Sequence, residues 1–105
     1  MIIIETPGYK NSKKKIKNNY LAQDKLKEVI SHIEVCDNYS SLKINPISKI
    51  YGFEELSGDL SGYCKFSLSI SKLRLIFTKE EEQIVKLEYI SDEHYTDFKK
   101  YLRRK

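Results

Sequence analysis

The chain has 105 residues, 40% hydrophobic and 32% charged, with a formal net charge of +4. This length fits one domain, residues 1–105, and the composition is globular rather than disordered. A basic domain favours polyanionic or acidic partners such as nucleic acid, an anionic membrane or an acidic protein.

Cysteine content and hydropathy indicate the compartment. Cys36 and Cys64 follow no metal-ligand spacing and are too few for a disulfide framework, so we expect two reduced, partly buried thiols. The apolar start stops at Glu5, and no run approaches the roughly 20 apolar residues that span a bilayer. We therefore expect a cytoplasmic protein with no membrane contact.

The N-terminal half is predicted to supply one strand and two helices. The β-branched run from Ile2 is stopped by Pro7-Gly8 and predicts a strand. A lysine-rich helix over residues 9–18 follows, and then a clearer amphipathic helix, whose apolar stripe is formed by Leu26, Val29, Ile30 and Ile33. His32 falls off this stripe, which predicts a solvated surface histidine.

The middle of the chain carries weaker patterns. Pro46 argues against a helix through residues 39–50. The aromatic and apolar residues of the segment 50–56 predict a strand, and the composition of 57–62 predicts a loop.

A hairpin is predicted over residues 63–77, with its turn at 69–72. Period-two alternation directs one set of side chains to the core and Lys65, Ser67 and Arg74 to the opposite face. The core set is Phe66, Leu68, Leu73, Leu75 and Phe77.

The C-terminal part predicts a last strand over 84–90 and a short helix. In that strand Val85, Leu87 and Tyr89 are expected to share one face. Ser91 or Asp92 is expected to cap the helix, which docks on the sheet through a stripe formed by Tyr95, Phe98 and Leu102. The predicted fold class is α+β: a small antiparallel sheet, two N-terminal helices on one face, and a short C-terminal helix.

The candidate chemistry rests on cations and one histidine. The sequence lacks a phosphate-binding glycine loop, a nucleophile elbow and a zinc-protease motif, so no metal site and no cofactor are expected. Arg74 interrupts an apolar run, which predicts either an ion pair with Glu88 across the last two strands or a guanidinium fork for phosphate. Lys65 is either a solvated lysine or a phosphate contact. His94 is a candidate proton-transfer group, and Tyr95 is either core or a stacking platform for a base.

These residues carry a resemblance. Gly62-Tyr63-x-Lys65-Phe66-x-Leu68, Lys72 to Phe77, Leu87 to Ile90 and His94-Tyr95-x-x-Phe98 together resemble the RelE/ParE superfamily of type II toxins. The resemblance covers about residues 56–102. It implies a compact toxin that is neutralised by a cognate antitoxin and that cleaves mRNA on the ribosome without metal.

The resemblance also implies roles for individual residues. Arg74 matches the strand arginine that stabilises the phosphate, and Lys65 stands where an arginine is common. His94 resembles a C-terminal residue used in proton transfer or phosphate contact. Phe98 matches an aromatic near the site, so Tyr63, Tyr95 and Phe98 are candidate substrate-binding residues.

One departure leaves alternatives open. Many family members carry a second arginine where this chain has Ser67, and serine does not replace arginine as a phosphate ligand. A non-enzymatic inhibitor of DNA gyrase, as in the ParE branch, is therefore one alternative. A degenerate toxin that only binds its antitoxin is another.

Overall fold

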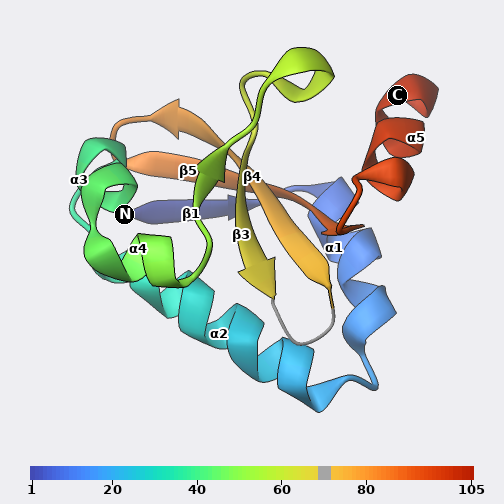
Figure 1. Cartoon of the computed structure of the whole chain (residues 1–105), viewed down its shortest axis with the longest axis horizontal. Helices are drawn as coiled ribbons and strands as arrows, with labels where there is room; N and C mark the ends of the chain where they lie inside the picture. Colours follow the sequence, from blue (N-terminus) through green and yellow to red (C-terminus); the bar gives the residue numbers. More distant parts are fainter. Residues whose placement is uncertain (69–71) are drawn as a thin grey trace.

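The computed structural model describes residues 1–68 and 72–105. The turn predicted at 69–72 thus lies almost wholly outside the described residues. A five-stranded sheet in the order β1-β5-β4-β3-β2 forms the centre of the molecule (Figure 1). Its strands are β1 (Ile2–Glu5), β2 (Glu54–Glu55), β3 (Cys64–Leu68), β4 (Leu73–Glu81) and β5 (Ile84–Asp92).

Short helices and one long helix surround this sheet. The N-terminal part supplies α1 (Pro7–Ser12), the 3-10 turn η1 (Lys13–Ile16) and the long α2 (Tyr20–Val35), which runs across one face (Figure 1). The remaining helical segments are α3 (Tyr39–Ile44), α4 (Pro46–Ile50), the 3-10 turn η2 (Gly58–Leu60) and α5 (Thr96–Arg104). No helix in these described ranges is long and apolar enough to cross a membrane. The α+β class is confirmed.

One strand departs from the predicted antiparallel sheet. β1 pairs parallel to β5, with Ile2 opposite Ile84 and Glu5 opposite Leu87, whereas the other strand pairs among the described residues are antiparallel. Parallel pairing needs a long crossover connection, which the helices between β1 and β5 supply. Strand direction is set by this connection and is not visible in a four-residue pattern, so the prediction was wrong for β1.

The main core lies between α2 and the sheet. Alternation on β3 and β4 places the predicted set there: Phe66, Leu68, Leu75 and Phe77 are at most 1% exposed, and Leu73 packs against them half-buried. The α2 stripe is confirmed in the same core, with Leu26, Val29 and Ile33 buried and Ile30 half-buried. Cys36 and Cys64 are both buried and free, as predicted.

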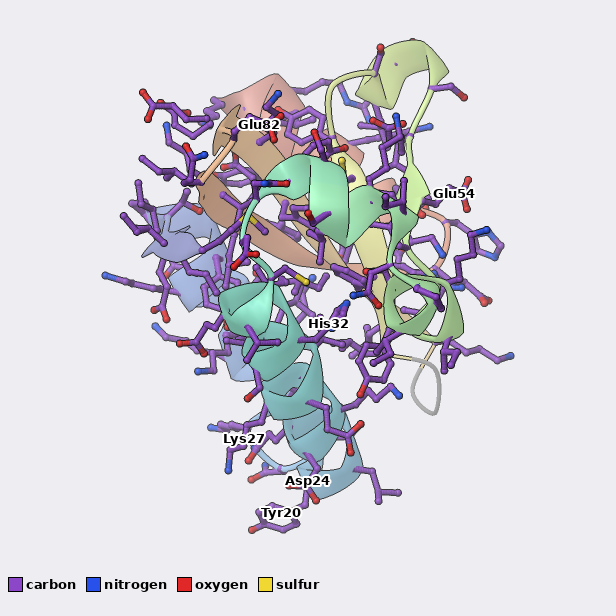
Figure 2. The ribbon with its side chains drawn as sticks, turned by 90° about the vertical axis from the view of Figure 1, so that its left-hand side faces the viewer. Tyr20, Asp24, Lys27, His32, Glu54 and Glu82 are labelled. Carbon is purple, nitrogen blue, oxygen red and sulfur yellow. The ribbon has the colours of Figure 1, made fainter. Side chains whose placement is uncertain are left out.

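His32 is buried, which corrects the prediction of a solvated side chain. It is 7% exposed, and its Nε2 lies 2.7 Å from the Ser48 Oγ. Ser48 belongs to α4, so His32 lies between α2 and α4 (Figure 2). Burial lowers its pKa because the charged imidazolium loses hydration. The apolar stripe marks only the sheet-facing side of α2, and a second helix covers the flank that carries His32.

No single helix runs through residues 39–50, as Pro46 predicts, but the segment forms two short helices, and Pro46 starts the second of them. It occupies the first turn of α4, where its missing N–H costs no hydrogen bond. The Asn45 side chain caps this helix by accepting the Ile47 N–H at 2.8 Å. Because α4 takes Pro46–Ile50, the predicted strand over 50–56 shrinks to the two residues of β2.

A β-bulge in β5 changes which way Tyr89 faces. Phe77 pairs with Leu87 while the preceding Ile76 pairs with Tyr89, so Glu88 is the extra residue. Val85 and Leu87 therefore face the main core as expected, but Tyr89 turns to the opposite face with Ile76. Strict alternation had placed Tyr89 with Leu87.

A second, smaller apolar cluster lies on that opposite face and is covered by α5. Its buried members are Leu60, Ile76 and Phe98, and half-buried residues including Tyr95 and Leu102 pack against them, as the predicted stripe requires. The Asp92 carboxylate accepts the N–H groups of His94 and Thr96, both at 3.0 Å, and so caps the start of α5. The face opposite α2 is thus covered at one end by α5.

Candidate active site

The uncovered part of this face carries the predicted cations. In the β3–β4 register Ser67 lies opposite Arg74 and Lys65 lies opposite Ile76. Directly opposed residues of antiparallel strands share a face, so these side chains project together, away from α2. The predicted separation of core and site residues on this hairpin is confirmed.

Lys65 is only 9% exposed, and its ammonium group lies in a nest of polar groups formed by Ser67 and Glu54. Its Nζ donates to the Ser67 Oγ at 3.1 Å and lies 3.8 Å from a Glu54 carboxylate oxygen. Burial, with a smaller effect of the Arg74 charge, lowers the Lys65 pKa, and Glu54 partly offsets this. Lys65 is therefore a better proton donor than an ordinary surface lysine.

Gly52 closes this nest, a role that the sequence did not reveal. Its φ is +75°, and a Cβ built there would lie 2.5 Å from the Ser67 Oγ and 3.5 Å from the Lys65 Nζ. The Ser67 N–H also donates to the Tyr51 carbonyl at 2.9 Å. The segment after α4 therefore lies directly against Ser67 and Lys65, and only glycine permits this approach.

The Arg74 guanidinium lies beside the Leu73 carbonyl and the Tyr95 phenol. Its Nη1 donates to its neighbour's carbonyl, at Leu73, at 3.1 Å. The alternative pairing with Glu88 is wrong, because Thr78 donates to the Glu88 carboxylate at 2.8 Å and Ser91 stands opposite Arg74 in the register. Within residues 1–68 and 72–105 no carboxylate lies within 4.0 Å of the Arg74 guanidinium. A half-buried guanidinium of this kind is suited to bind a phosphate.

Tyr95 brings a phenol to the same place. It is half-buried in the left-handed conformation, with φ +62°, at the start of α5. Burial raises its pKa, the nearby positive charge of Arg74 opposes that shift, and Glu54 adds to it. The phenol thus shares its electrostatic environment with Arg74 and Glu54.

The structure does not bring every predicted site residue to this cluster. The His94 side chain is 81% exposed, with its Nε2 3.4 Å from a Glu93 carboxylate oxygen. Phe98 is 1% exposed, and its ring centroid lies 5.1 Å from that of half-buried Tyr63. Lys65, Arg74 and Tyr95 therefore form one cluster, His94 projects from the adjacent turn, and Phe98 and Tyr63 pack below it.

Within the described ranges, no three His, Cys, Asp or Glu side chains are grouped so as to hold a metal ion. The described residues of the cluster supply positive charge, from Arg74 and Lys65, and a phenol, from Tyr95.

Comparison with solved structures identifies the fold. YafQ from E. coli superposes with a TM-score of 0.62 at 16% identity, over 88% of this chain and 92% of that one. The YoeB/ParE toxin from Agrobacterium tumefaciens gives 0.60 at 15% identity, over 86% and 95%. The toxin in the YoeB-YefM complex from Staphylococcus aureus gives 0.56 at 21% identity, over 86% and 93%.

Neither a family model nor a curated protein sequence matches the chain. The resemblance inferred from the strand and helix motifs is nevertheless confirmed at the level of the fold, which is that of RelE/ParE-superfamily toxins. Two of these neighbours were solved with antitoxins, as DinJ-YafQ and YoeB-YefM.

Proposed function

We propose that this protein is the toxin of a type II toxin–antitoxin system, a metal-independent endoribonuclease that cleaves mRNA on the ribosome in the cytoplasm. The observation that carries the proposal is the cluster on the uncovered sheet face. An arginine free of ion pairs among the described residues and a desolvated lysine share one strand pair with a tyrosine at its edge. A cognate antitoxin is expected to neutralise it, as in the complexes of its structural neighbours.

The reaction that fits these groups is internal transfer at an RNA phosphate. The ribose 2′-oxygen attacks phosphorus, the bond to the 5′-oxygen breaks, and the products are a 2′,3′-cyclic phosphate and a 5′-hydroxyl. Arg74 binds the phosphate and stabilises the extra charge of the phosphorane. Lys65, with its lowered pKa, protonates the leaving 5′-oxygen.

The remaining candidates act on the substrate from the edges of the cluster. The exposed imidazole of His94 is accessible to RNA bound at Arg74 and takes the 2′-hydroxyl proton. The Tyr95 ring supports the neighbouring base, and Tyr63 and Phe98 hold the sheet side of α5 beneath it.

The test is induction in bacteria with mapping of mRNA 5′ ends. The wild type should arrest growth and produce 5′-hydroxyl ends at codon boundaries. Arg74→Ala should lower cleavage by roughly 100- to 1,000-fold, the usual cost of removing one preorganised donor, and His94→Ala should also lower it. Arg104→Ala, at an exposed arginine near the end of α5, is the matched control. Cleavage that is unchanged in both Arg74→Ala and His94→Ala would sink the proposal.

One observation favours a second function. The Ser67 hydroxyl accepts a hydrogen bond from Lys65 and supplies no cation, and no described contact joins His94 to Lys65 or Arg74. A toxin without a catalytic base fits a non-enzymatic inhibitor of DNA gyrase. Growth arrest with intact mRNA, DNA damage and inhibited gyrase would support that function instead.

A further inference from the structure

A groove lined by lysines lies away from the candidate active site, between α2 and the α1–η1 segment. Its volume is about 390 Å³, and its rim is formed by Lys10, Lys13, Lys14, Lys17 and Lys27. Lys27 and Glu54, the latter beside the candidate active site, lie on opposite sides of the view in Figure 2. The groove is thus a separate surface.

Hydrogen bonds join the two segments that form the groove. The Gln23 side-chain amide donates to the carbonyls of Ile16 and Lys17, at 2.7 and 2.8 Å, and so ties the end of η1 to α2. The lysines of η1 and α2 therefore keep a set spacing at their Cα atoms, while their long side chains adapt to a ligand.

The rim charges are uncompensated. Across residues 1–68 and 72–105, none of the five rim lysines has a carboxylate within 4.0 Å, whereas Lys15, Lys25 and Lys43 elsewhere are ion-paired. No acidic side chain is among the described residues that line the groove. Converging cations without counter-charges raise the local concentration of polyanions.

The residues that line the groove indicate which kind of polyanion it suits. Two of its three apolar lining residues, Ile16 and Leu26, are 1% and 2% exposed, and the third, Ile30, is half-buried, so Ile30 alone of the three leaves apolar side-chain surface for an acidic amphipathic helix. Exposed apolar side chains lie outside the lining, at Tyr20 and Leu21 at the start of α2 and at Val35, Ile44, Ile47 and Ile50. The described lining also holds no aromatic ring, whereas proteins that bind single strands use aromatic rings to stack bases.

We propose that the groove between α1–η1 and α2 binds the phosphate backbone of a nucleic-acid duplex through Lys10, Lys13, Lys14, Lys17 and Lys27. Lysine ammonium groups contact phosphates as point charges without reading sequence. If the proposed function holds, the duplex is folded RNA of the ribosome, and the groove docks the toxin while the sheet face meets the mRNA.

The experiment measures binding of a fluorescein-labelled RNA duplex of about 16 base pairs to the purified full chain by anisotropy, over about 50 to 200 mM salt. A variant with Lys10, Lys14, Lys17 and Lys27 changed to Ala keeps Lys13, which lies over the Tyr9 ring. All four positions are exposed. We expect this variant to bind roughly 100-fold more weakly, with a salt slope about three units shallower.

A matched control removes the same charge elsewhere. Changing Lys49, Lys99, Lys100 and Lys105 to Ala also lowers the formal net charge from +4 to zero at exposed positions. The control should keep most of the affinity. Equal weakening of both variants, or no weakening of either, overturns the proposal, as does binding of an acidic helical peptide with no duplex binding.

A DNA duplex of the same length identifies the source of the phosphates. Preference for RNA points to the ribosome and comparable DNA binding points to a DNA target, and either result supports a duplex-phosphate groove. The proposed function is tested separately, because Arg74→Ala should lose cleavage and keep duplex binding. Duplex binding without any cleavage would refute the proposed function alone.

Discussion

The two faces of the β3–β4 strand pair differ in composition, although the residues that form them alternate along the same two strands. The face under α2 holds Phe66 and Phe77 at 0% exposure, with ring centroids 5.3 Å apart and planes nearly parallel. The other face carries buried Ile76 with the Lys65 cation opposite it, and the Arg74 cation one position further along that face, opposite Ser67. The face under α2 therefore contributes most of the buried apolar surface of this strand pair. The other face carries charged side chains at positions where apolar residues would be more stabilising. The following predictions test this division.

The largest stability loss is expected on the face under α2. Phe66→Ala should lower the free energy of unfolding by about 3–5 kcal/mol, because it removes a fully buried ring and leaves a cavity. Urea denaturation followed by circular dichroism measures this. Arg74→Ala on the opposite face should change stability by less than about 1 kcal/mol, since this arginine has no ion pair in the described structure to lose. A similar cost for both variants would contradict the division.

An intermediate effect is expected at Gly52, where a loop meets the charged face. Gly52→Ala should destabilise the protein by about 2–3 kcal/mol, because it adds a close contact with Ser67 to the strain of a positive φ. Gly58→Ala is the matched control, since Gly58 also has a positive φ, +62°, but among the described residues no heavy atom beyond its chain neighbours lies within 4 Å of its Cβ position. It should cost about 1 kcal/mol.

The difference between the two glycine variants isolates the contact with Ser67 and Lys65. Gly52→Ala should also impair RNA cleavage through displacement of Lys65, whereas Gly58→Ala should not. Equal stability and equal activity of the two variants would show that the nest around Lys65 is looser than the described geometry.

The smallest effect concerns His32, a titratable group beside the apolar face. Its folded-state pKa is lowered, so the unfolded chain takes up its proton first as the pH falls. The free energy of unfolding should therefore be greatest above the ordinary histidine pKa and should decline as the pH drops through it towards the lowered value. The change should stay below about 1.5 kcal/mol, the scale of one buried polar interaction.

Denaturation midpoints measured on either side of the ordinary histidine pKa check the prediction for His32. His32→Gln should flatten the decline between these conditions. His94→Gln, at a histidine whose side chain is 81% exposed, is the matched substitution against which the effect of His32→Gln is compared. A decline that persists in His32→Gln would assign it to other groups.

Sequence patterns predicted those parts of the fold that depend on interactions between residues close together in the chain. Alternation separated Phe66 and Leu75 from Lys65 and Arg74, since the pleat of a strand fixes which way a side chain points. The long α2 helix followed from its stripe for the same kind of reason. The predictions failed where contacts between distant segments determine the structure. Helix α4 buries His32, the crossover connection sets the direction of β1, and the bulge at Glu88 directs the Tyr89 side chain to the opposite face.

The candidate site was predicted in part. Lys65 and Arg74 were identified because cations in alternating apolar strands are costly unless they are placed for use. Gly52 was missed because its sequence neighbours do not indicate that it adopts a positive φ or that it packs against Ser67 of β3, a strand that follows β2 and η2 in the chain. Glu54 and the Lys65–Ser67 hydrogen bond depend on how the β2 edge is placed, which pattern alone does not give.

The parallel pairing of β1 with β5 has a consequence for synthesis of the chain. Strand β1 is made before the other strands of the sheet, yet its hydrogen-bonding partner, Ile84 to Leu87 of β5, is made after all of them. Pairing between such distant segments closes a long loop, which slows folding. The sheet therefore cannot be completed until β5 has been made, and the charged face of β3 and β4 acquires its finished surroundings only after β5 and α5 have followed.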